Sequence, residues 1–276
     1  MEFSNLKGVT VDKITILSLE QMKEERKKIT MLTAYDFPTA QILDHCGVDM
    51  LLVGDSVGNT MLGYDNTLPV TMEEMVHHTK AVVKGRKRAL VVADMPFMSY
   101  QISVEEAKKN AGRLIKEGGA EAVKVEGGEN IEAVIRAICE IDIPVMGHIG
   151  LTPQSIHRMG GYHVQGKEEK QREKLLADAL AVERAGAFAL VLEVIPVSLA
   201  QEITALLKIP TIGIGAGLHC DGQVLVINDL LGISAEFRPK FIKRYVNLQD
   251  IIGKAVKDFI SEVKEGKFPE EKHSFK

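Results

Sequence analysis

Cysteine is scarce in this chain, which argues against a disulfide-rich secreted protein and against a cysteine-based metal site. The three residues, Cys46, Cys139 and Cys220, stand far apart and are odd in number. They form neither a CxxC metal pair nor a disulfide framework, which favours a reducing compartment. Each thiol is therefore expected to be a small buried hydrophobe rather than a nucleophile.

Long apolar runs are also missing. No stretch approaches the roughly 20 residues that span a bilayer, and residues 1–28 hold no apolar core followed by a cleavage site. The 34 Lys and Arg residues are mixed with 38 Asp and Glu along the whole chain, so neither a basic stripe nor an acidic tail is present. We predict a cytoplasmic protein with a small-molecule partner and with no nucleic-acid or membrane partner.

What the sequence does contain is a repeated alternation of two kinds of segment. Short runs rich in Val, Ile and Leu alternate with amphipathic stretches, which is the pattern of parallel βαβ units. Eight runs have the nearly continuous apolar character of strands buried on both faces: 29–35, 49–55, 89–95, 121–127, 144–150, 188–194, 210–216 and 222–228. The chain of 276 residues also matches the roughly 250 residues of an α/β barrel. We therefore predict a (β/α)8 TIM barrel.

Helices are predicted between these runs, at 38–47, 71–85, 103–119, 129–140, 167–185, 197–207 and 248–265. Thr71 with Glu74, and Ser103 with Glu106, have the spacing of capping boxes. Residues 217–221 are too few for a helix, so the seventh unit is expected to be truncated. Residues 10–28 predict an extra N-terminal helix, opened by Ser18, that closes the bottom of the barrel.

An open doubly wound sheet is the alternative arrangement of such units. We favour the barrel because the strand count is eight and no strand is followed by a GxGxxG fingerprint and a helix. No linker rich in Pro, Gly or Ser divides the chain. Residues 1–276 are thus expected to form a single domain, with residues 266–276 as a frayed tail.

Carboxylates stand at five of the first six predicted strand ends, which is where enzymes of this fold carry their chemistry. Acids are only 38 of the 276 residues, so chance would place about one at six such positions. The acids are Asp36, Asp55, Asp94, Glu126 and Glu193, and Lys124 and His148 accompany them. Because side chains two apart in a strand share a face, Lys124 and Glu126 are expected to point the same way.

Each of these residues also has a structural interpretation. Asp36, two residues before Pro38, is a candidate helix N-cap, and a lone His148 is more often a hydrogen-bonded core residue than a ligand. For the other four acids, one shared functional site is a simpler explanation than four separate structural roles. Because converging acids repel one another unless a cation lies among them, we predict a divalent metal site, and oxygen ligands favour Mg²⁺.

The run LVGDSVGNTMLGYDNTLPVTMEEMVHHTKAV (52–82) resembles the signature of the ketopantoate hydroxymethyltransferase family. Further matches are ADMPFMSY (93–100), VKVEGG (123–128), GHIGLTPQSIHRMGGYHVQG (147–166), LEVIP (192–196), IGIGAG (212–217) and DGQVLV (221–226). The resemblance spans roughly residues 10–265, without departure at a functional position.

The resemblance implies a barrel related to phosphoenolpyruvate mutase and isocitrate lyase. It implies transfer of a hydroxymethyl group from 5,10-methylenetetrahydrofolate to 3-methyl-2-oxobutanoate through a Mg²⁺-stabilised enolate. The product would be 2-dehydropantoate, an intermediate of pantothenate and coenzyme A biosynthesis. A homodecamer is implied as well.

The resemblance also assigns roles to residues. The Mg²⁺ site would comprise Asp55, Asp94 and Glu126. The oxo acid would contact Asp55, Ser56, Asp94 and Lys124. Glu193 would be the general base, and His148 would lie near the leaving nitrogen or the metal-bound waters. The loop 152–166, which contains Gln154, is expected to form a lid over the folate.

Two other functions fit a barrel with acids at its mouth. One is another Mg²⁺-dependent oxo-acid lyase or aldolase of the phosphoenolpyruvate mutase and isocitrate lyase group. Those enzymes typically carry a KKCGH-like motif, whereas this chain reads EGGENIEAV at 126–134. The other is a non-catalytic oxo-acid or metal-binding barrel, which would have no need of a base such as Glu193.

Overall fold

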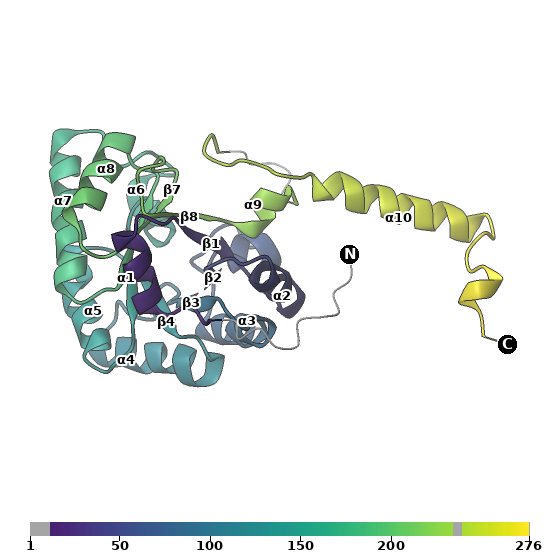
Figure 1. The fold of residues 1–276 in the computed structure, drawn as a ribbon, viewed down its shortest axis with the longest axis horizontal. Coiled ribbons are helices and arrows are strands. Elements are labelled where there is room, and N and C mark those ends of the chain that lie inside the picture. Colours follow the sequence, from purple (N-terminus) through teal and green to yellow (C-terminus); the bar gives the residue numbers. More distant parts are fainter. Residues whose placement is uncertain (1–11, 234–238, 276) are drawn as a thin grey trace. The chain divides into compact units, whose positions relative to one another are not determined.

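Eight short parallel strands form a closed barrel in the computed structural model, which describes residues 12–233 and 239–275 (Figure 1). Their order around the barrel is the order of the chain, and β8 pairs with β1. The strands are β1 (Ile29–Thr33), β2 (Met50–Val53), β3 (Leu90–Asp94), β4 (Ala122–Glu126), β5 (Val145–Gly150), β6 (Ala189–Glu193), β7 (Thr211–Ile214) and β8 (Gly222–Leu225). The predicted barrel is confirmed, and the open sheet is excluded.

Helices connect and surround the strands (Figure 1). The α-helices are α1 (Ile16–Glu24), α2 (Phe37–His45), α3 (Met72–Gly85), α4 (Val104–Arg113), α5 (Glu132–Cys139), α6 (Ile156–Met159), α7 (Glu169–Arg184), α8 (Val197–Leu206), α9 (Ile227–Leu231) and α10 (Leu248–Lys264). Single π or 3-10 turns are η1 (Gly58–Leu62), η2 (Leu114–Gly118), η3 (Glu129–Ile131), η4 (Pro153–Ser155) and η5 (Glu271–His273). Residues 215–221, between β7 and β8, contain no helix, as their number predicted.

The side chains that face the interior change character along the barrel. Towards the amino ends of the strands they are apolar and form one buried cluster, which includes Met31, Leu90 and Met146. Two residues further along a strand, the same face carries polar groups, such as Lys124 after Ala122 and His148 after Met146. The lower barrel is therefore a packed core, and the polar groups collect at the carboxyl ends.

Helix α1 closes the bottom of the barrel, as the sequence predicted. Leu19 is fully buried within the interior cluster, and Ile16 and Met22 pack against it. The ammonium of Lys23 adds a polar clamp, because it donates to the carboxylate of Asp221 (2.8 Å) and to two backbone carbonyls. Residues 10–11 of the predicted helical segment lie outside the described residues.

Two predicted helix starts need correction. The N-cap of α1 is Thr15, which forms a reciprocal capping box with Ser18, so Ser18 lies inside the helix at its third position. Ser103 accepts from the backbone N–H of Glu106, but the Glu106 side chain does not complete a box and instead accepts from Asn110. The Thr71–Glu74 box is confirmed in full.

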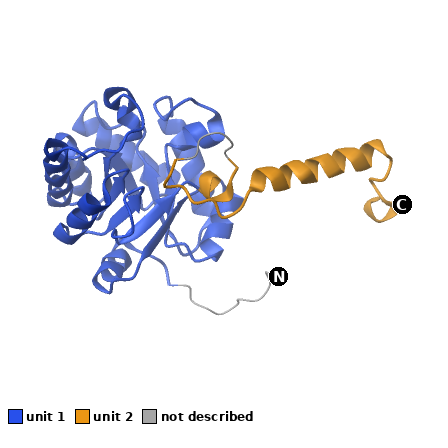
Figure 2. Cartoon of the chain, turned by 90° about the horizontal axis from the view of Figure 1, so that it is seen from above, with its two compact units in different colours: residues 1–226 blue, residues 227–276 orange. Residues whose placement is uncertain are grey.

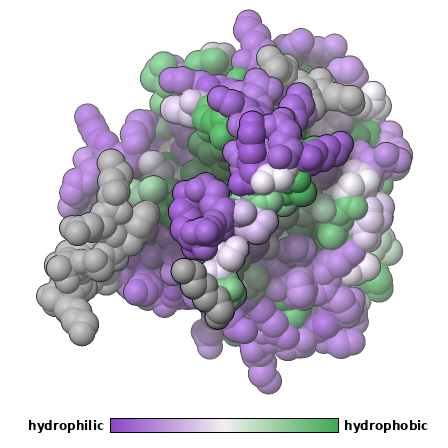
Figure 3. Space-filling model, turned by 90° about the vertical axis from the view of Figure 1, so that its right-hand side faces the viewer, coloured by the Kyte–Doolittle hydropathy of each residue, from purple (hydrophilic) through white to green (hydrophobic). Residues whose placement is uncertain are grey.

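The chain divides into two compact units, residues 1–226 and 227–276 (Figure 2). The first contains all eight strands, and the second contains α9, α10 and η5. The single domain over 1–276 and its frayed tail stay predictions. No helix among the described residues is long and apolar enough to cross a bilayer, and hydrophilic residues predominate on the face drawn in Figure 3.

Candidate active site

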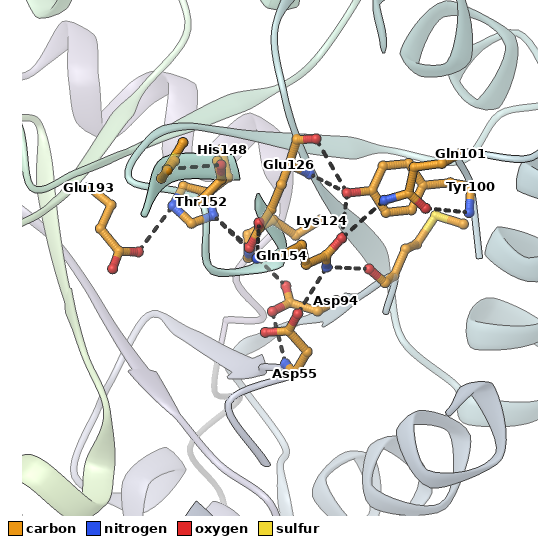
Figure 4. A network of polar contacts seen from close by, with 12 residues as sticks. Asp55, Asp94, Tyr100, Gln101, Lys124, Glu126, His148, Thr152, Gln154 and Glu193 are labelled. Carbon is orange, nitrogen blue, oxygen red and sulfur yellow. Dashed lines mark hydrogen bonds and ion pairs between the residues drawn. The ribbon is translucent and has the colours of Figure 1, made fainter. Parts of the chain in front are cut away.

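Six of the charged or titratable residues predicted for the site gather at the carboxyl ends of five adjacent strands (Figure 4). They are Asp55 just after β2, Asp94 on β3, Lys124 and Glu126 on β4, His148 on β5 and Glu193 on β6. All except Glu193 are buried. Glu193 keeps 16% of its side chain exposed, which leaves it open to a small molecule.

The register of the barrel sets which of these side chains are neighbours. Asp94 pairs with Lys124 across β3 and β4, and Glu126 pairs with His148 across β4 and β5. Side chains of paired residues in adjacent strands lie on the same face of the sheet. Each acid in these two pairs is therefore placed beside a cationic or protonatable group.

Asp94 lies between Lys124 and the backbone that carries Asp55. The Lys124 ammonium is 3.1 Å from Asp94 Oδ1, and the backbone N–H of Asp55 donates to Asp94 Oδ2 (3.0 Å). The Lys124 contact is an ion pair, and within the described part of the chain the buried Oδ1 has no geometrically defined hydrogen-bond partner. A buried carboxylate oxygen without such a partner is costly, and it can serve as a ligand.

His148 bridges two carboxylates, as Figure 4 shows. Its Nδ1 is 3.3 Å from Glu126 Oε1, and its Nε2 is 3.0 Å from Glu193 Oε2. Burial and the charge of Lys124 would lower the pKa of His148, but the two carboxylates outweigh them and raise it to about 9. The raised pKa favours an imidazolium that faces Glu126 through Nδ1 and Glu193 through Nε2, although the Lys124 ammonium also lies 3.2 Å from Nδ1.

The acids of the cluster differ in their protonation. Burial, with the charges of Asp94 and Glu126, raises the pKa of Asp55 well above its ordinary value. Burial also raises the pKa of Asp94, although Lys124 opposes it. Burial would do the same to Glu126, but the hydrogen bond and charge of His148 bring its pKa below the usual value. Negative charge is therefore least well compensated at Asp55.

Two features of the backbone beside the site are unusual. A Cβ on Gly54 would lie 2.6 Å from Ser56 Oγ and 3.5 Å from Asp94 Oδ2, so only glycine keeps this space open. Val194, directly after Glu193, has φ 49°, a conformation that is rare and strained for a β-branched residue. Strain of this kind commonly accompanies functional sites.

Of the two remaining strand-end residues, Ser56 lies beside the site and Asp36 caps a helix. The hydroxyl of Ser56 lies 2.8 Å from the buried Tyr35 hydroxyl, beside the site. Asp36 instead caps α2, since its carboxylate accepts from the backbone N–H (2.8 Å) and hydroxyl (2.9 Å) of Thr39. The predicted cap is confirmed, and the structure assigns Asp36 no contact with the cluster described above.

Three residues of the site received no catalytic role from the sequence: Tyr100, Gln101 and Gln154. Gln154 was placed on a lid, yet it is buried against Asp55 and Glu126 (Figure 4). Tyr100 is fully buried and bonds to Gln154 and to the backbone of Glu126. These residues lie in the loops that follow β3 and β5. Loops at this end of the barrel complete the active sites of the fold, so their polar residues were a sequence signal for further site residues.

A divalent cation fits the Asp55–Asp94 pair. Four carboxylates face two cations in the cluster, so an excess of negative charge remains even when Lys124 and His148 are both protonated. No three Asp, Glu, His or Cys side chains of the described residues form a ready-made metal cage. Mg²⁺ characteristically binds through one or two carboxylates and keeps its other positions for water and substrate. Both oxygens of Glu126 are already engaged, by His148 and by the Gln154 N–H.

The charge on His148 makes stability depend on pH. In chelator-treated protein its raised pKa stabilises the fold fully below the unfolded value near 6.5, and this contribution disappears as pH rises towards about 9. We expect wild type to lose on the order of 2 kcal/mol relative to His148→Gln over that range. Denaturant unfolding of both proteins at pH 6 and pH 9.5 measures the difference, and parallel curves would contradict it.

Solved structures share this fold at low sequence identity. Phosphonopyruvate hydrolase in complex with oxalate and Mg²⁺ aligns with a TM-score of 0.61 and 11% identity, over 95% of this chain and 91% of that one. Phosphoenolpyruvate phosphomutase from Streptomyces platensis subsp. rosaceus gives 0.61 and 15%, over 95% and 92%. A 2,3-dimethylmalate lyase gives 0.58 and 14%, over 94% and 91%. This likeness shows the fold, which these proteins share with the chain as a whole barrel.

Sequence comparison identifies the family. The family model for ketopantoate hydroxymethyltransferase matches residues 13–271. A 3-methyl-2-oxobutanoate hydroxymethyltransferase from Citrifermentans bemidjiense is 64% identical over 95% of this chain and 98% of the relative. The enzyme of that name from Geobacter metallireducens is 62% identical with the same coverage. The chain belongs to the ketopantoate hydroxymethyltransferase family.

Proposed function

We propose that this protein transfers a hydroxymethyl group from 5,10-methylenetetrahydrofolate to 3-methyl-2-oxobutanoate and so forms 2-dehydropantoate. The observation that carries the proposal is the family match along residues 13–271, which includes every residue of the acidic cluster. In the overall reaction a C–H bond at C3 of the oxo acid breaks and a C–C bond forms. Water supplies the hydroxyl oxygen, and tetrahydrofolate leaves.

The binding part of the site consists of Asp55, Ser56, Asp94 and Lys124. The Lys124 ammonium, held by Asp94, supplies a fixed positive charge for the carboxylate of the oxo acid. Ser56 can donate to the same carboxylate if Tyr35 donates to Ser56. Mg²⁺ would rest on Asp55 and Asp94, with Glu126 beside it, and would polarise the keto group as a Lewis acid.

Glu193 is the proposed general base. Its carboxylate is the most exposed of the four acids, and His148 holds its Oε2 at 3.0 Å. The other oxygen can take the C3 proton of the oxo acid, after which the enolate carbon forms the new bond. In this proposal His148 orients the base, whereas the sequence predicted a place near the leaving nitrogen or the metal-bound waters.

A turnover assay tests the function directly. Purified protein with 5,10-methylenetetrahydrofolate and 3-methyl-2-oxobutanoate should form 2-dehydropantoate, detected by mass spectrometry, and omission of either substrate should abolish the product. Chelation should remove activity, and added Mg²⁺ should restore it. Protein that forms no product with both substrates and Mg²⁺ present would contradict the proposal.

We further propose a cytoplasmic homodecamer. Support comes from α10, which has no buried residue. Its apolar side chains recur at helical spacing, at 251, 252, 256, 259, 260 and 263, and all of these are exposed. An amphipathic helix buries its apolar stripe against another surface, and in the proposed decamer that surface belongs to a neighbouring subunit. The particle mass in solution, in multiples of 30.3 kDa, tests the number, and a monomeric mass would contradict it.

A further inference from the structure

Gln154 forms an unusually complete set of polar contacts for a neutral side chain at an acidic site. It lies in η4, directly after β5, and is buried. Its side-chain Nε2 donates to Asp55 Oδ2 (2.9 Å) and to the backbone carbonyl of Met95 (3.0 Å). Its Oε1 accepts from the hydroxyl of Tyr100 (2.7 Å) and from Nε2 of Gln101 (3.2 Å). Figure 4 shows this amide between Asp55 and Tyr100.

These partners leave only one orientation for the amide. A backbone carbonyl can only accept, so the group that faces Met95 must be the NH₂ group, and its second N–H then points at Asp55. Tyr100 has one hydroxyl proton. Its oxygen accepts from the backbone N–H of Glu126 (3.0 Å). Its proton can go to Gln154 Oε1 (2.7 Å) or to the backbone carbonyl of Glu126 (3.3 Å), and the shorter distance favours Gln154. Both N–H groups of the amide and its oxygen are satisfied.

The backbone of Gln154 adds a second link to the acids. Its N–H donates to Glu126 Oε2 (3.0 Å). One residue therefore fixes an oxygen of Asp55 and an oxygen of Glu126, although these two acids come from the ends of different strands.

The neutrality of Gln154 matters as much as its position. Asp94 has the Lys124 ammonium as its direct partner, whereas the side-chain hydrogen bond to Asp55 Oδ2 comes from an uncharged amide. Such a donor fixes one oxygen of Asp55 without neutralising the carboxylate. The negative charge of Asp55, and its Oδ1, stay available to a cation or to a substrate.

We propose that Gln154 is a positioning residue, whose amide, oriented by Tyr100, fixes the Asp55 carboxylate with one oxygen held and the other turned towards the ligand. The inference rests on the proposed function, because it assigns Asp55 to binding of the metal and the oxo acid. In this role Gln154 belongs to the binding part of the site and not to the predicted lid over the folate.

Gln154→Leu tests the proposal, with Gln171→Leu as a matched control. Gln171 loses the same amide, but its side chain contacts the backbone N–H of Gly166 instead of an acid of the site. For Gln154→Leu we expect the Kd for Mn²⁺ alone, measured by electron paramagnetic resonance, to rise on the order of 10- to 100-fold. We expect KM for the oxo acid to rise as well, whereas Gln171→Leu should stay within about threefold of wild type in both measurements.

Two further variants keep the test decisive if Gln154→Leu unfolds. Gln154→Met preserves the length of the side chain, and Tyr100→Phe removes only the hydroxyl that orients the amide. Both should weaken Mn²⁺ binding while the thermal unfolding transition persists. Folded Gln154 variants with wild-type Mn²⁺ affinity and KM would overturn the positioning role and leave the function intact. Wild-type protein that neither binds Mn²⁺ nor forms product would overturn the function itself.

Discussion

Replacement of Glu193 by Gln should abolish exchange of the C3 proton of 3-methyl-2-oxobutanoate with deuterium from solvent. The amide is nearly the same size as the carboxylate and can keep the contact with His148 Nε2, which lies 3.0 Å from Glu193 Oε2 in the wild-type protein. It cannot take up a proton at neutral pH. Loss of a general base costs roughly 100- to 10,000-fold in rate, and nuclear magnetic resonance of the oxo acid in deuterated buffer measures it.

Binding should survive this substitution, because Glu193 lies apart from Asp55, Asp94 and Lys124. The affinities for Mn²⁺ and for the oxo acid are therefore expected to stay near wild type. Glu202→Gln is a matched control, since Glu202 lies on α8 in the same βα unit and pairs with Arg172 on the surface. Wild-type exchange in Glu193→Gln would exclude Glu193 as the base.

The sequence was sufficient for the barrel because its evidence is local. Each strand is a short apolar run, and each long helix carries its own start and stop signals, as in Thr71 and Glu74. The corrections concern single helix caps. Ser18 and Thr15 both suit an N-cap, and the choice between them depends on how Leu19 enters the barrel interior.

The strand-end acids were also predictable, but their partners were not. Alternation along β4 correctly placed Lys124 and Glu126 on one face, and both are buried. That His148 pairs with Glu126 depends on the register between β4 and β5, which the stagger of the closed barrel sets. No spacing within one segment of the chain reports that stagger, so the bridge from Glu126 to Glu193 could not be read from the sequence.

Gln154 was misplaced for a related reason. Loop residues have no periodicity, so composition alone suggested a mobile cover rich in glycine. The structure shows a buried amide whose contacts reach Asp55, about 100 positions away in the chain. Such a role follows from the return of the loop into the barrel mouth, which only the tertiary structure displays.

Replacement of Asp94 by Ala should remove the metal dependence of the reaction along with most of its rate. Among the described residues Asp94 Oδ1 is buried without a hydrogen-bond partner, and the backbone N–H of Asp55 donates to its other oxygen. Loss of one of the proposed carboxylate ligands and of the partner of Lys124 should lower kcat/KM by at least about 100-fold. Added Mg²⁺ should no longer change the rate in a titration of the steady-state assay.

Two variants, Asp36→Ala and Asp94→Asn, distinguish loss of the Asp94 charge from a general loss of protein stability. Asp36→Ala removes a helix cap, which costs about 1 kcal/mol of stability, and should keep the Mg²⁺ response. Asp94→Asn retains the shape and can still accept from the backbone N–H of Asp55 through its carbonyl oxygen, so its fold should persist while its metal response disappears. Full activity of Asp94→Ala with an unchanged Mg²⁺ titration would remove Asp94 from the metal site. The excess negative charge of the cluster would then have to be met by protons, for which Asp55, with its strongly raised pKa, is the first acceptor.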